Sequence, residues 1–247
     1  MGRSLKSPGV SDSVPTPTAA IHLRPTAPLA ERVLLPGDPG RALLLAQSLL
    51  QEPRMFNHHR GLWGYTGAAG DGEPLTIQAT GIGGPSSAIV LSELIQLGVR
   101  RAIRVGTCGA LVPSLALGDL VIARESICAD GTSRALGARE RLAADGELTE
   151  ALVRSAPAAQ AGTIVSVDVF YETANSQRRA PADAALALEM EAAALFAVGA
   201  AAHVPVACLL AVSDTFDAGG SRTRIDDSSL AAASERMGAV AVAALVG

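Results

Sequence analysis

The stretch LTIQATGIGGPSSAIVLSELIQLGVRRAIRV, residues 75–105, decides the fold class of this chain. A short apolar run at 75–80 ends in a glycine-rich turn, a helical pattern of apolar residues follows at 87–98, and a second apolar run occupies 102–105. Short apolar runs bounded by turn residues are typical of buried strands, and a longer periodic segment is typical of a helix. The stretch therefore predicts a strand, a helix and a strand of an α/β protein.

The same alternation continues on both sides of this stretch, which predicts one largely buried sheet with helices on its faces. The further expected elements are strands at 32–35, 119–123, 163–167 and 207–212 and helices at 41–50, 188–198 and 230–245. We find no linker that would separate a second domain and no internal repeat. Residues 1–20, rich in Ser, Pro, Thr and Gly, are expected to form a flexible tail, and residues 21–247 a single domain.

The composition is that of a globular protein. Of the 247 residues, 49% are hydrophobic and 18% are charged, so the chain has enough apolar side chains to build a core and is not a disordered protein. The 20 basic and 24 acidic residues give a net charge of −4 and form no block of one sign. Because a polyanion binds to a basic surface, we expect no nucleic acid partner.

Residues 192–212 contain no Asp, Glu, Lys or Arg and are long enough to be considered as a membrane span. They are mostly alanine and are interrupted by Gly199, His203 and Pro205. We therefore interpret them as a helix, a turn and a buried strand, and we expect no membrane partner.

Cysteine usage and the N-terminal tail both bear on the cellular compartment. Cys108, Cys128 and Cys208 are scattered without a CxxC spacing or a Cys/His pairing, which argues against a disulfide framework and against a zinc site. The tail has basic residues but no apolar segment of the kind found in a secretory signal. A cytoplasmic protein without a metal site is expected.

Two loops combine glycine with arginine. In PGDPGR, residues 36–41, two glycines let the backbone approach a ligand, a helix start offers free N–H groups, and Arg41 adds a fork of donors, which together suit a phosphate. The same residues are also compatible with an ordinary turn. In IRVGTCG, residues 103–109, Arg104 lies on a buried strand and needs an anionic partner, either a protein carboxylate or a bound oxyanion. The glycine-rich turn that follows, with its free N–H groups and one hydroxyl, favours the oxyanion.

Three further segments have residues suited to a ligand. The glycines of TGIGGPS, residues 80–86, either make room for a flat ligand or only form a turn, and their spacing does not match a dinucleotide-binding fingerprint. In LEMEA, residues 188–192, the dipole of the expected helix explains one glutamate, and the other should face inward and bind donors such as a diol. In VSDT, residues 212–215, Asp214 follows a buried strand and either meets a substrate or caps a helix.

The order and wording of seven blocks of sequence resemble the nucleoside phosphorylase family, which includes the bacterial hexameric purine nucleoside phosphorylases and the uridine phosphorylases. The blocks are PGDPGR (36–41), HRGLWGYTG (59–67), TGIGGPSSAIVLSEL (80–94), IRVGTCGAL (103–111), SVDVFYE (166–172), LEMEAAALF (188–196) and AVSDTF (211–216). Together with Ile21 and His22 they extend over nearly all of the chain after the tail.

The resemblance implies a single α/β domain whose central mixed sheet closes into a distorted barrel flanked by helices. It also implies dimers that usually assemble into a hexamer, as a trimer of dimers. The implied reaction joins a nucleoside and inorganic phosphate as substrates, gives free base and ribose 1-phosphate, and needs no metal or other cofactor. The matching residues are Gly37, Arg41, Arg104 and Thr107 for phosphate, His22 and Arg60 from a neighbouring subunit, Phe170 stacked on the base, Met190 and Glu191 on the ribose, Ile82, Glu189 and Ser213 completing the nucleoside site, and Asp214 facing the purine.

The chemistry explains these residue types. Breaking the N-glycosidic bond develops positive charge on the sugar and negative charge on the base, so phosphate behind the sugar and a proton donor at the base lower the same barrier from opposite ends. Asp214 is the expected donor. An arginine of the following helix often assists this acid in the purine branch, and here the corresponding segment, residues 217–227, is altered. Arg222 or Arg224 would take that place.

Three alternatives stay open at this point. Uridine phosphorylases lack the acid at Asp214 and carry an insertion with a Gln and an Arg for uracil, which Gln177 and Arg178 superficially resemble. Hydrolytic nucleosidases of the same superfamily use water and lack the PGDPGR loop. A nucleoside-binding protein without activity would keep the base and ribose contacts, but it would not need Asp214 and Arg104 as well.

Overall fold

The computed structural model describes residues 20–171, 185–217 and 219–246. The segment expected to be a flexible tail lies, except for its last residue, outside the described residues. The strands are β1 (Arg32–Leu35), β2 (Gln51–Asn57), β3 (Gly64–Ala68), β4 (Pro74–Gln78), β5 (Arg101–Ala110), β6 (Leu120–Cys128), β7 (Arg141–Ala143), β8 (Gln160–Ser166), β9 (Ala187–Glu189), β10 (Val206–Phe216) and β11 (Arg222–Arg224). The helices are α1 (Pro39–Leu49), α2 (Gly84–Leu97), α3 (Gly131–Ala135), α4 (Gly146–Ser155), α5 (Ala192–Ala202) and α6 (Asp227–Leu245), and η1 (His59–Gly61) is a short 3-10 turn.

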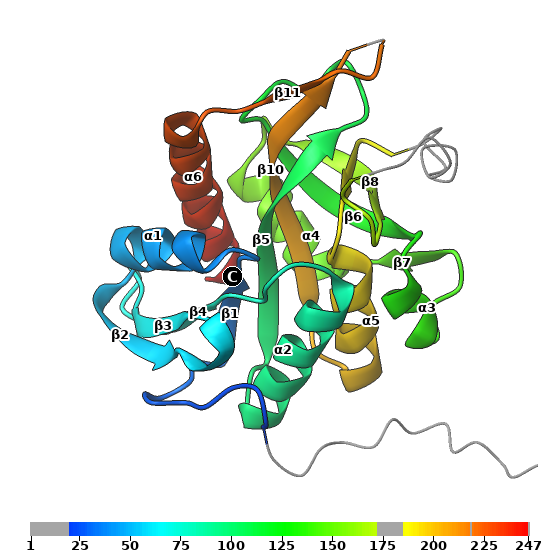
Figure 1. Cartoon of the computed structure of the whole chain (residues 1–247). Coiled ribbons are helices and arrows are strands. Elements are labelled where there is room, and N and C mark those ends of the chain that lie inside the picture. Colours follow the sequence, from blue (N-terminus) through cyan, green and yellow to red (C-terminus); the bar gives the residue numbers. More distant parts are fainter. Residues whose placement is uncertain (1–19, 172–184, 218, 247) are drawn as a thin grey trace, which may run out of the picture.

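The strands form one mixed sheet that closes on itself through its central members. The order is β11-β10-β6-β8-β9-β5-β1-β4-β3-β2, and β10 also pairs in parallel with β5. The additional pairing joins β5, β10, β6, β8 and β9 into a ring, while β1 to β4 extend from it as an open wing (Figure 1). This arrangement confirms the expected α/β domain with a sheet that closes into a distorted barrel.

Strand β5 divides its pairing between the wing and the ring. Its first residues pair with β1, ending at Leu35 opposite Arg104, whereas its last residues pair with β9, beginning at Gly109 opposite Leu188. Among the described strands, none pairs with that edge of β5 between these two positions. Ligands of α/β proteins bind where neighbouring strands diverge in this way, beyond their carboxyl ends.

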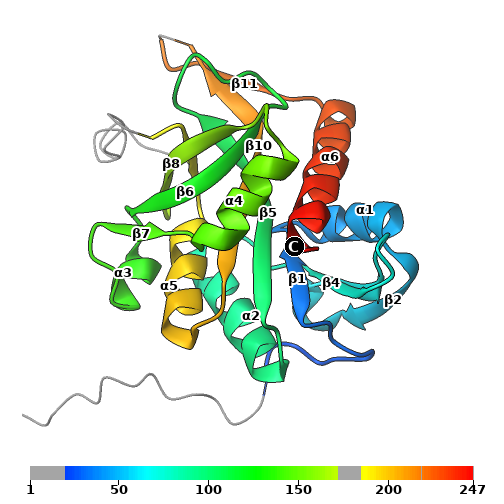
Figure 2. The same cartoon turned by 180° about the vertical axis from the view of Figure 1, so that it is seen from behind.

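Two layers of helices cover the sheet. Helices α2, α3 and α5 pack together on one side (Figure 1), and α1, α4 and α6 pack on the other (Figure 2). Alternate residues of β1 belong to two different cores. Val33 and Leu35 lie in the cluster that contains Leu91 of α2, and Leu34 lies in the cluster that contains Met237 of α6. Burial on both faces explains why the strands appear in the sequence as continuous apolar runs.

One predicted element is wrong in its bounds. The helix expected at 188–198 begins at Ala192, because residues 187–189 form β9 between β5 and β8. The Glu189 carboxylate accepts hydrogen bonds from the amides of Glu191 and Ala192, at 2.9–3.0 Å, and so marks the start of α5. Strand pairing with distant segments, which local periodicity does not reveal, decides this boundary.

Candidate active site

Two glycine-containing loops lie side by side where β1 and β4 end. The Gly81 amide donates to the Gly37 carbonyl at 3.0 Å, and a Cβ on Gly37 would lie 3.2 Å from the Gly81 carbonyl oxygen. Asp38 caps α1 by accepting from the Gly40 amide at 2.8 Å, so the segment turns into that helix and Arg41 lies in its first turn. The loop therefore combines a helix start with an arginine, as the phosphate prediction requires.

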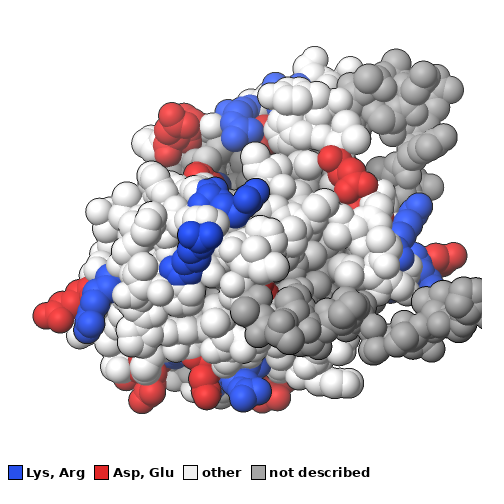
Figure 3. Space-filling model, turned by 60° about the horizontal axis from the view of Figure 1, so that its bottom comes forward, with Lys and Arg blue, Asp and Glu red and all other residues white. Residues whose placement is uncertain are grey.

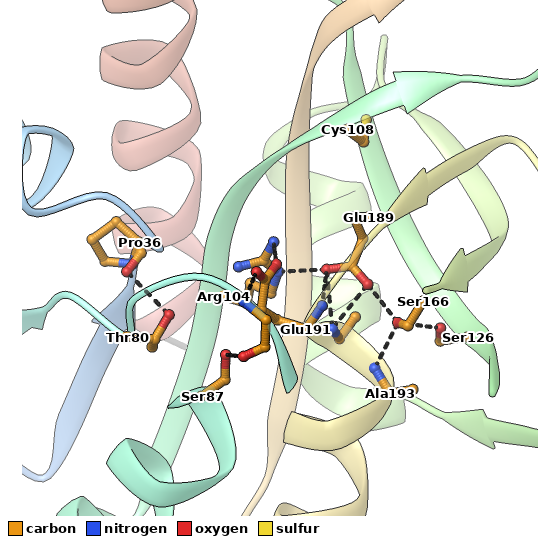
Figure 4. Close-up of polar contacts among 12 residues, drawn as sticks. Pro36, Thr80, Ser87, Arg104, Cys108, Ser126, Ser166, Glu189, Glu191 and Ala193 are labelled. Carbon is orange, nitrogen blue, oxygen red and sulfur yellow. Dashed lines mark hydrogen bonds and ion pairs between the residues drawn. The ribbon is translucent and has the colours of Figure 1, made fainter. Parts of the chain in front are cut away.

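Arg104 is the buried centre of the site (Figure 4). Its Nε donates to Glu189 Oε2 at 2.9 Å, and its Nη2 donates to Glu191 Oε2. The side chain folds back over Gly106, where a Cβ would lie only 2.6–3.0 Å from the guanidinium atoms. Although burial alone would lower the pKa of Arg104, the charges of Glu191 and Glu189 outweigh it and raise that pKa. The sequence left open a protein carboxylate or an oxyanion as partner, and two carboxylates fill the first role.

One nitrogen of Arg104 is nevertheless left without a partner. Its Nη1 is buried and has no hydrogen-bond partner within the described residues. A buried N–H group without an acceptor costs about 1–3 kcal/mol, so this atom is suited to an acceptor from outside the chain. Arg41 adds a second cation nearby: burial lowers the pKa of Arg41, with Arg104 and Arg224 acting in the same direction and Asp38 and Glu191 opposing them.

Glu189 and Glu191 differ in how many hydrogen bonds their carboxylates accept from the protein. Both are buried, which corrects the expectation that only one of them faces inward. Glu189 accepts from Arg104, from Ser166 Oγ and from two backbone amides, and burial raises its pKa. Glu191 accepts from the Gly83 amide at 2.6 Å and from Arg104. Glu189 is therefore the structural member of the pair, and Glu191 keeps acceptor capacity for a ligand.

A pair of buried serines supports this network, and sequence reasoning did not find it. Ser166 Oγ donates to Glu189 Oε1, lies 2.9 Å from Ser126 Oγ and accepts from the Ala193 amide at 2.9 Å (Figure 4). Ser166 lies inside the quoted block SVDVFYE, but a single serine on a strand carries no signal of this role. The hydrogen bonds fix the orientation of Glu189 and, through it, that of Arg104.

Asp214 lies inside β10 and not at a helix start, so the capping interpretation is wrong. The pairing of β10 with β5 is irregular between Val212 and Asp214, a distortion of the kind that re-aims side chains near active sites. Ser213 Oγ donates to Asp214 Oδ2 at 2.6 Å, and Arg224 Nη1 lies 3.1 Å from both carboxylate oxygens. Arg222 Nε lies 3.4 Å from Oδ1. Both arginines expected to assist Asp214 thus contact it, from β11.

Aromatic side chains lie next to this acid. The Arg222 guanidinium lies 4.3 Å from the ring centroid of Phe170 and 5.8 Å from that of Phe216. Phe170 also contacts Tyr171 edge to face, with centroids 5.0 Å apart. The expected stacking residue is therefore half-exposed and lies against Arg222, which in turn contacts Asp214, so a flat ring would find an apolar surface near a polar edge.

The remaining expected site residues are placed less directly. His22 Nδ1 contacts Glu93 Oε1 of α2 at 2.7 Å, and Arg60 is exposed in a left-handed conformation (φ 60°) within η1. Within the described residues, neither is joined to Arg104 by a hydrogen bond or an ion pair. The other three are a half-buried Thr107 on β5, a half-buried Met190 between β9 and α5, and a largely exposed Ile82.

The described part of the chain contains neither a candidate metal site nor a candidate membrane span. Its residues include no group of three His, Cys, Asp or Glu side chains that could hold a metal ion. None of the helices in residues 20–171, 185–217 and 219–246 is long and apolar enough to cross a membrane. On the face drawn in Figure 3, side chains of both charges are scattered among uncharged residues and no broad basic field is seen.

Comparison with known proteins identifies the family. The model of the phosphorylase superfamily matches residues 31–246. The chain belongs to the phosphorylase superfamily. A purine nucleoside phosphorylase DeoD-type of Alkaliphilus metalliredigens is 37% identical over 204 residues, 79% of this chain and 87% of the relative. Proteins of the same name from Clostridium beijerinckii (37% over 210 residues, covering 81% and 88%) and Geobacillus kaustophilus (36% over 196 residues, covering 76% and 83%) are also similar. The resemblance drawn from the seven blocks is confirmed.

Proposed function

We propose that this superfamily member is a purine nucleoside phosphorylase, a pentosyltransferase that converts a purine ribonucleoside or deoxyribonucleoside and inorganic phosphate into free base and the pentose 1-phosphate. The observation that carries the proposal is the buried Nη1 of Arg104, which has no hydrogen-bond partner among the described residues and lies near Arg41. Relatives named as purine nucleoside phosphorylases support the substrate class. Phosphate is a co-substrate, and the reaction needs no further cofactor.

One end of the proposed site binds phosphate, and the other end binds the base. At one end, Gly37, Arg41, Arg104 and Thr107 hold phosphate behind the sugar, where positive charge develops. Glu191, with its free acceptor capacity, binds the ribose hydroxyls, and Met190 lines the sugar site. At the other end, Phe170 stacks on the base, Ile82 and Ser213 border the nucleoside, and Asp214 gives a proton to the leaving purine. Glu189 keeps Arg104 in place.

Asp214 favours a purine substrate over a pyrimidine. The sequence resemblance associates this acid with the purine branch, and its contacts with Ser213, Arg222 and Arg224 give it a defined orientation. Gln177 and Arg178, on which the uridine alternative rests, lie outside the described residues. The relatives carry the purine name, so the pyrimidine reading has the weaker support.

We also propose that two subunits share each site, within a hexamer formed as a trimer of dimers. His22 and Arg60, the phosphate residues expected from a neighbour, are not joined to Arg104 within one chain, and exposed apolar side chains lie beside them: Ile21 and Trp63. Such side chains are suited to an interface between copies.

The proposed location is the cytoplasm, because the three cysteines are buried free thiols, as suits a reducing compartment.

A panel of nucleosides tests this function. Inosine, guanosine, adenosine and uridine are each incubated with the full-length protein, with and without phosphate, and base release is followed. We expect release from purine nucleosides that depends on phosphate. Release without phosphate would indicate a hydrolase, release from uridine alone would indicate the pyrimidine branch, and binding without turnover would indicate a nucleoside-binding protein.

A further inference from the structure

The donors around Asp214 are not used equally. Ser213 and Arg224 already supply hydrogen bonds to both carboxylate oxygens, at 2.6 and 3.1 Å. Arg222 Nε lies 3.4 Å from Asp214 Oδ1, which makes an ion pair and not a hydrogen bond. Its two terminal nitrogens make no hydrogen bond within the described residues. Arg222 therefore brings unused N–H donors to the edge of the site.

The position of Arg222 relative to the aromatic rings shows where these donors lie. Its guanidinium is 4.3 Å from the centroid of Phe170, in the space above a ring where a stacked base would lie, and Phe216 is farther away at 5.8 Å. The side chain is one-third exposed, so it has room to shift. A base that stacks on Phe170 must move the guanidinium sideways, while the ion pair with Asp214 keeps it near the edge of the base.

We propose that Arg222 reads the substituent at position 6 of the purine and gives the enzyme a preference for 6-oxopurine over 6-aminopurine nucleosides. This inference rests on the proposed function, since it takes Phe170 and Asp214 as the base site. With Asp214 at N7, the unused N–H groups of Arg222 meet the neighbouring O6 of hypoxanthine or guanine, which accepts hydrogen bonds. In adenine the same place holds an amino group, which donates and is mismatched with a guanidinium.

Charge development during the reaction strengthens this preference. The leaving 6-oxopurine spreads negative charge onto O6, where a guanidinium stabilises it more than in the ground state. A carboxylate with a free oxygen would instead accept from the amino group of adenine. Asp214 Oδ2 already accepts from both Ser213 and Arg224, and Oδ1 accepts from Arg224 and forms an ion pair with Arg222, so four donor contacts compete with an amino group for this carboxylate and this edge of the site favours acceptors on the base.

The test compares kcat/KM for inosine and adenosine in the wild type, Arg222→Met and Arg222→Lys. Methionine keeps the length of the side chain and removes the donors, while lysine keeps the charge and loses the planar fork. We expect the wild type to favour inosine by about tenfold or more, Arg222→Met to bring the ratio close to one through loss on inosine, and Arg222→Lys to lie between them. Arg224→Met should lower both substrates by a similar factor. A ratio unchanged in Arg222→Met, or a wild type that favours adenosine, would overturn the inference.

Binding of the free bases separates this inference from the function on which it rests. Calorimetric titration with hypoxanthine and adenine requires no turnover. If the protein releases no base from any nucleoside but binds hypoxanthine more tightly than adenine, and loses that difference in Arg222→Met, then the proposed function fails and the role of Arg222 stands. If the protein binds neither base, or binds both equally, then Arg222 has no such role. Thermal unfolding of each variant shows whether the fold is kept.

Discussion

The guanidinium of Arg104 links the two carboxylates of the site to the place proposed for phosphate. Two of its nitrogens bind Glu189 and Glu191, and the third, Nη1, is buried and finds no partner in the described part of the chain. An arginine held on two sides is fixed in orientation before a ligand arrives, so little conformational entropy is lost when phosphate binds. The buried Ser126 and Ser166 extend this fixing to a second layer of residues.

Replacing Arg104 by glutamine tests its proposed role in binding phosphate. Glutamine keeps one donor for a carboxylate but removes the charge and Nη1, so we expect a loss of about 2–5 kcal/mol in transition-state binding, seen mainly as a higher KM for phosphate. Arg124→Gln is the matched control, because Arg124 forms an exposed ion pair with Glu150 far from the site, and such pairs contribute little. A wild-type KM for phosphate in Arg104→Gln would contradict the assignment.

Asp214→Asn tests the proton donor. The amide keeps the shape of the side chain and can donate a hydrogen bond, but it cannot transfer a proton. We expect kcat with adenosine to fall by about 10²–10⁴. Inosine should lose less, because its 6-oxo group spreads the charge of the leaving base, and 7-methylguanosine, whose base leaves from a cationic state, should be nearly unaffected. An equal loss on all three substrates would show that Asp214 is structural.

Among the elements, β5 positions most of the site because its edge changes partner from β1 to β9. The backbone at Gly106 lies under the Arg104 guanidinium, at a distance that leaves no room for a Cβ. A strand interior normally disfavours glycine, so a close approach of this kind explains its presence here.

Gly106→Ala should therefore displace the guanidinium while leaving every charged group present. A misplacement of about 1 Å can lower the rate by about 10²-fold, and we expect kcat/KM for phosphate to fall by that order. Gly146→Ala, at the start of α4 where a Cβ meets no atom within 4 Å, is the control and should keep wild-type kinetics. Unchanged kinetics in Gly106→Ala would mean that the position of Arg104 does not matter.

The segment around His22 is attached to α2 by one carboxylate. Glu93 accepts from the amides of residues 21–23 and from the His22 ring, and although burial alone would raise the pKa of Glu93, these hydrogen bonds outweigh it and lower that pKa. A lowered carboxyl pKa stabilises the fold above the unfolded value of about 4.3, and this stabilisation is lost as the pH falls through the folded value.

Glu93→Gln should accordingly lower the free energy of unfolding by about 1–3 kcal/mol at pH 7. The difference between variant and wild type should shrink as the pH falls below about 4, because the wild-type carboxyl is then protonated as well. Urea unfolding at a series of pH values measures this difference. A difference that stays constant down to the acid limit would show that the charge of Glu93 is not the cause.

Much of the fold could be predicted from the sequence. The parts that could not be predicted leave no local pattern, for physical reasons. The apolar runs of β1 and β10 and the helical period of α2 were predicted because burial on both sides leaves a strong pattern. Strand β2 was missed because five of its seven residues are exposed, and three of these five, Gln51, Glu52 and Arg54, are polar. The pairing of Ser166 with Glu189 depends on segments that meet only in the fold, so no local pattern indicates it.

For the molecule as a whole, we propose that a second copy completes the site with His22 and Arg60. Mixing Arg60→Ala with Asp214→Ala tests this arrangement, because some interfaces of a mixed oligomer would then combine an intact Arg60 with an intact Asp214. We expect each variant alone to be nearly inactive and the mixture, after dissociation and reassembly, to recover part of the activity. No recovery in oligomers shown to be mixed would contradict shared sites.

In the proposed reaction, phosphate held by Arg104 and Arg41 takes up the pentose in place of water. Phosphorus NMR of the wild-type protein with inosine and phosphate observes this transfer directly. We predict a new resonance from ribose 1-phosphate that grows in step with the release of hypoxanthine. Release of hypoxanthine with free ribose, while the phosphate resonance stays unchanged, would contradict the account.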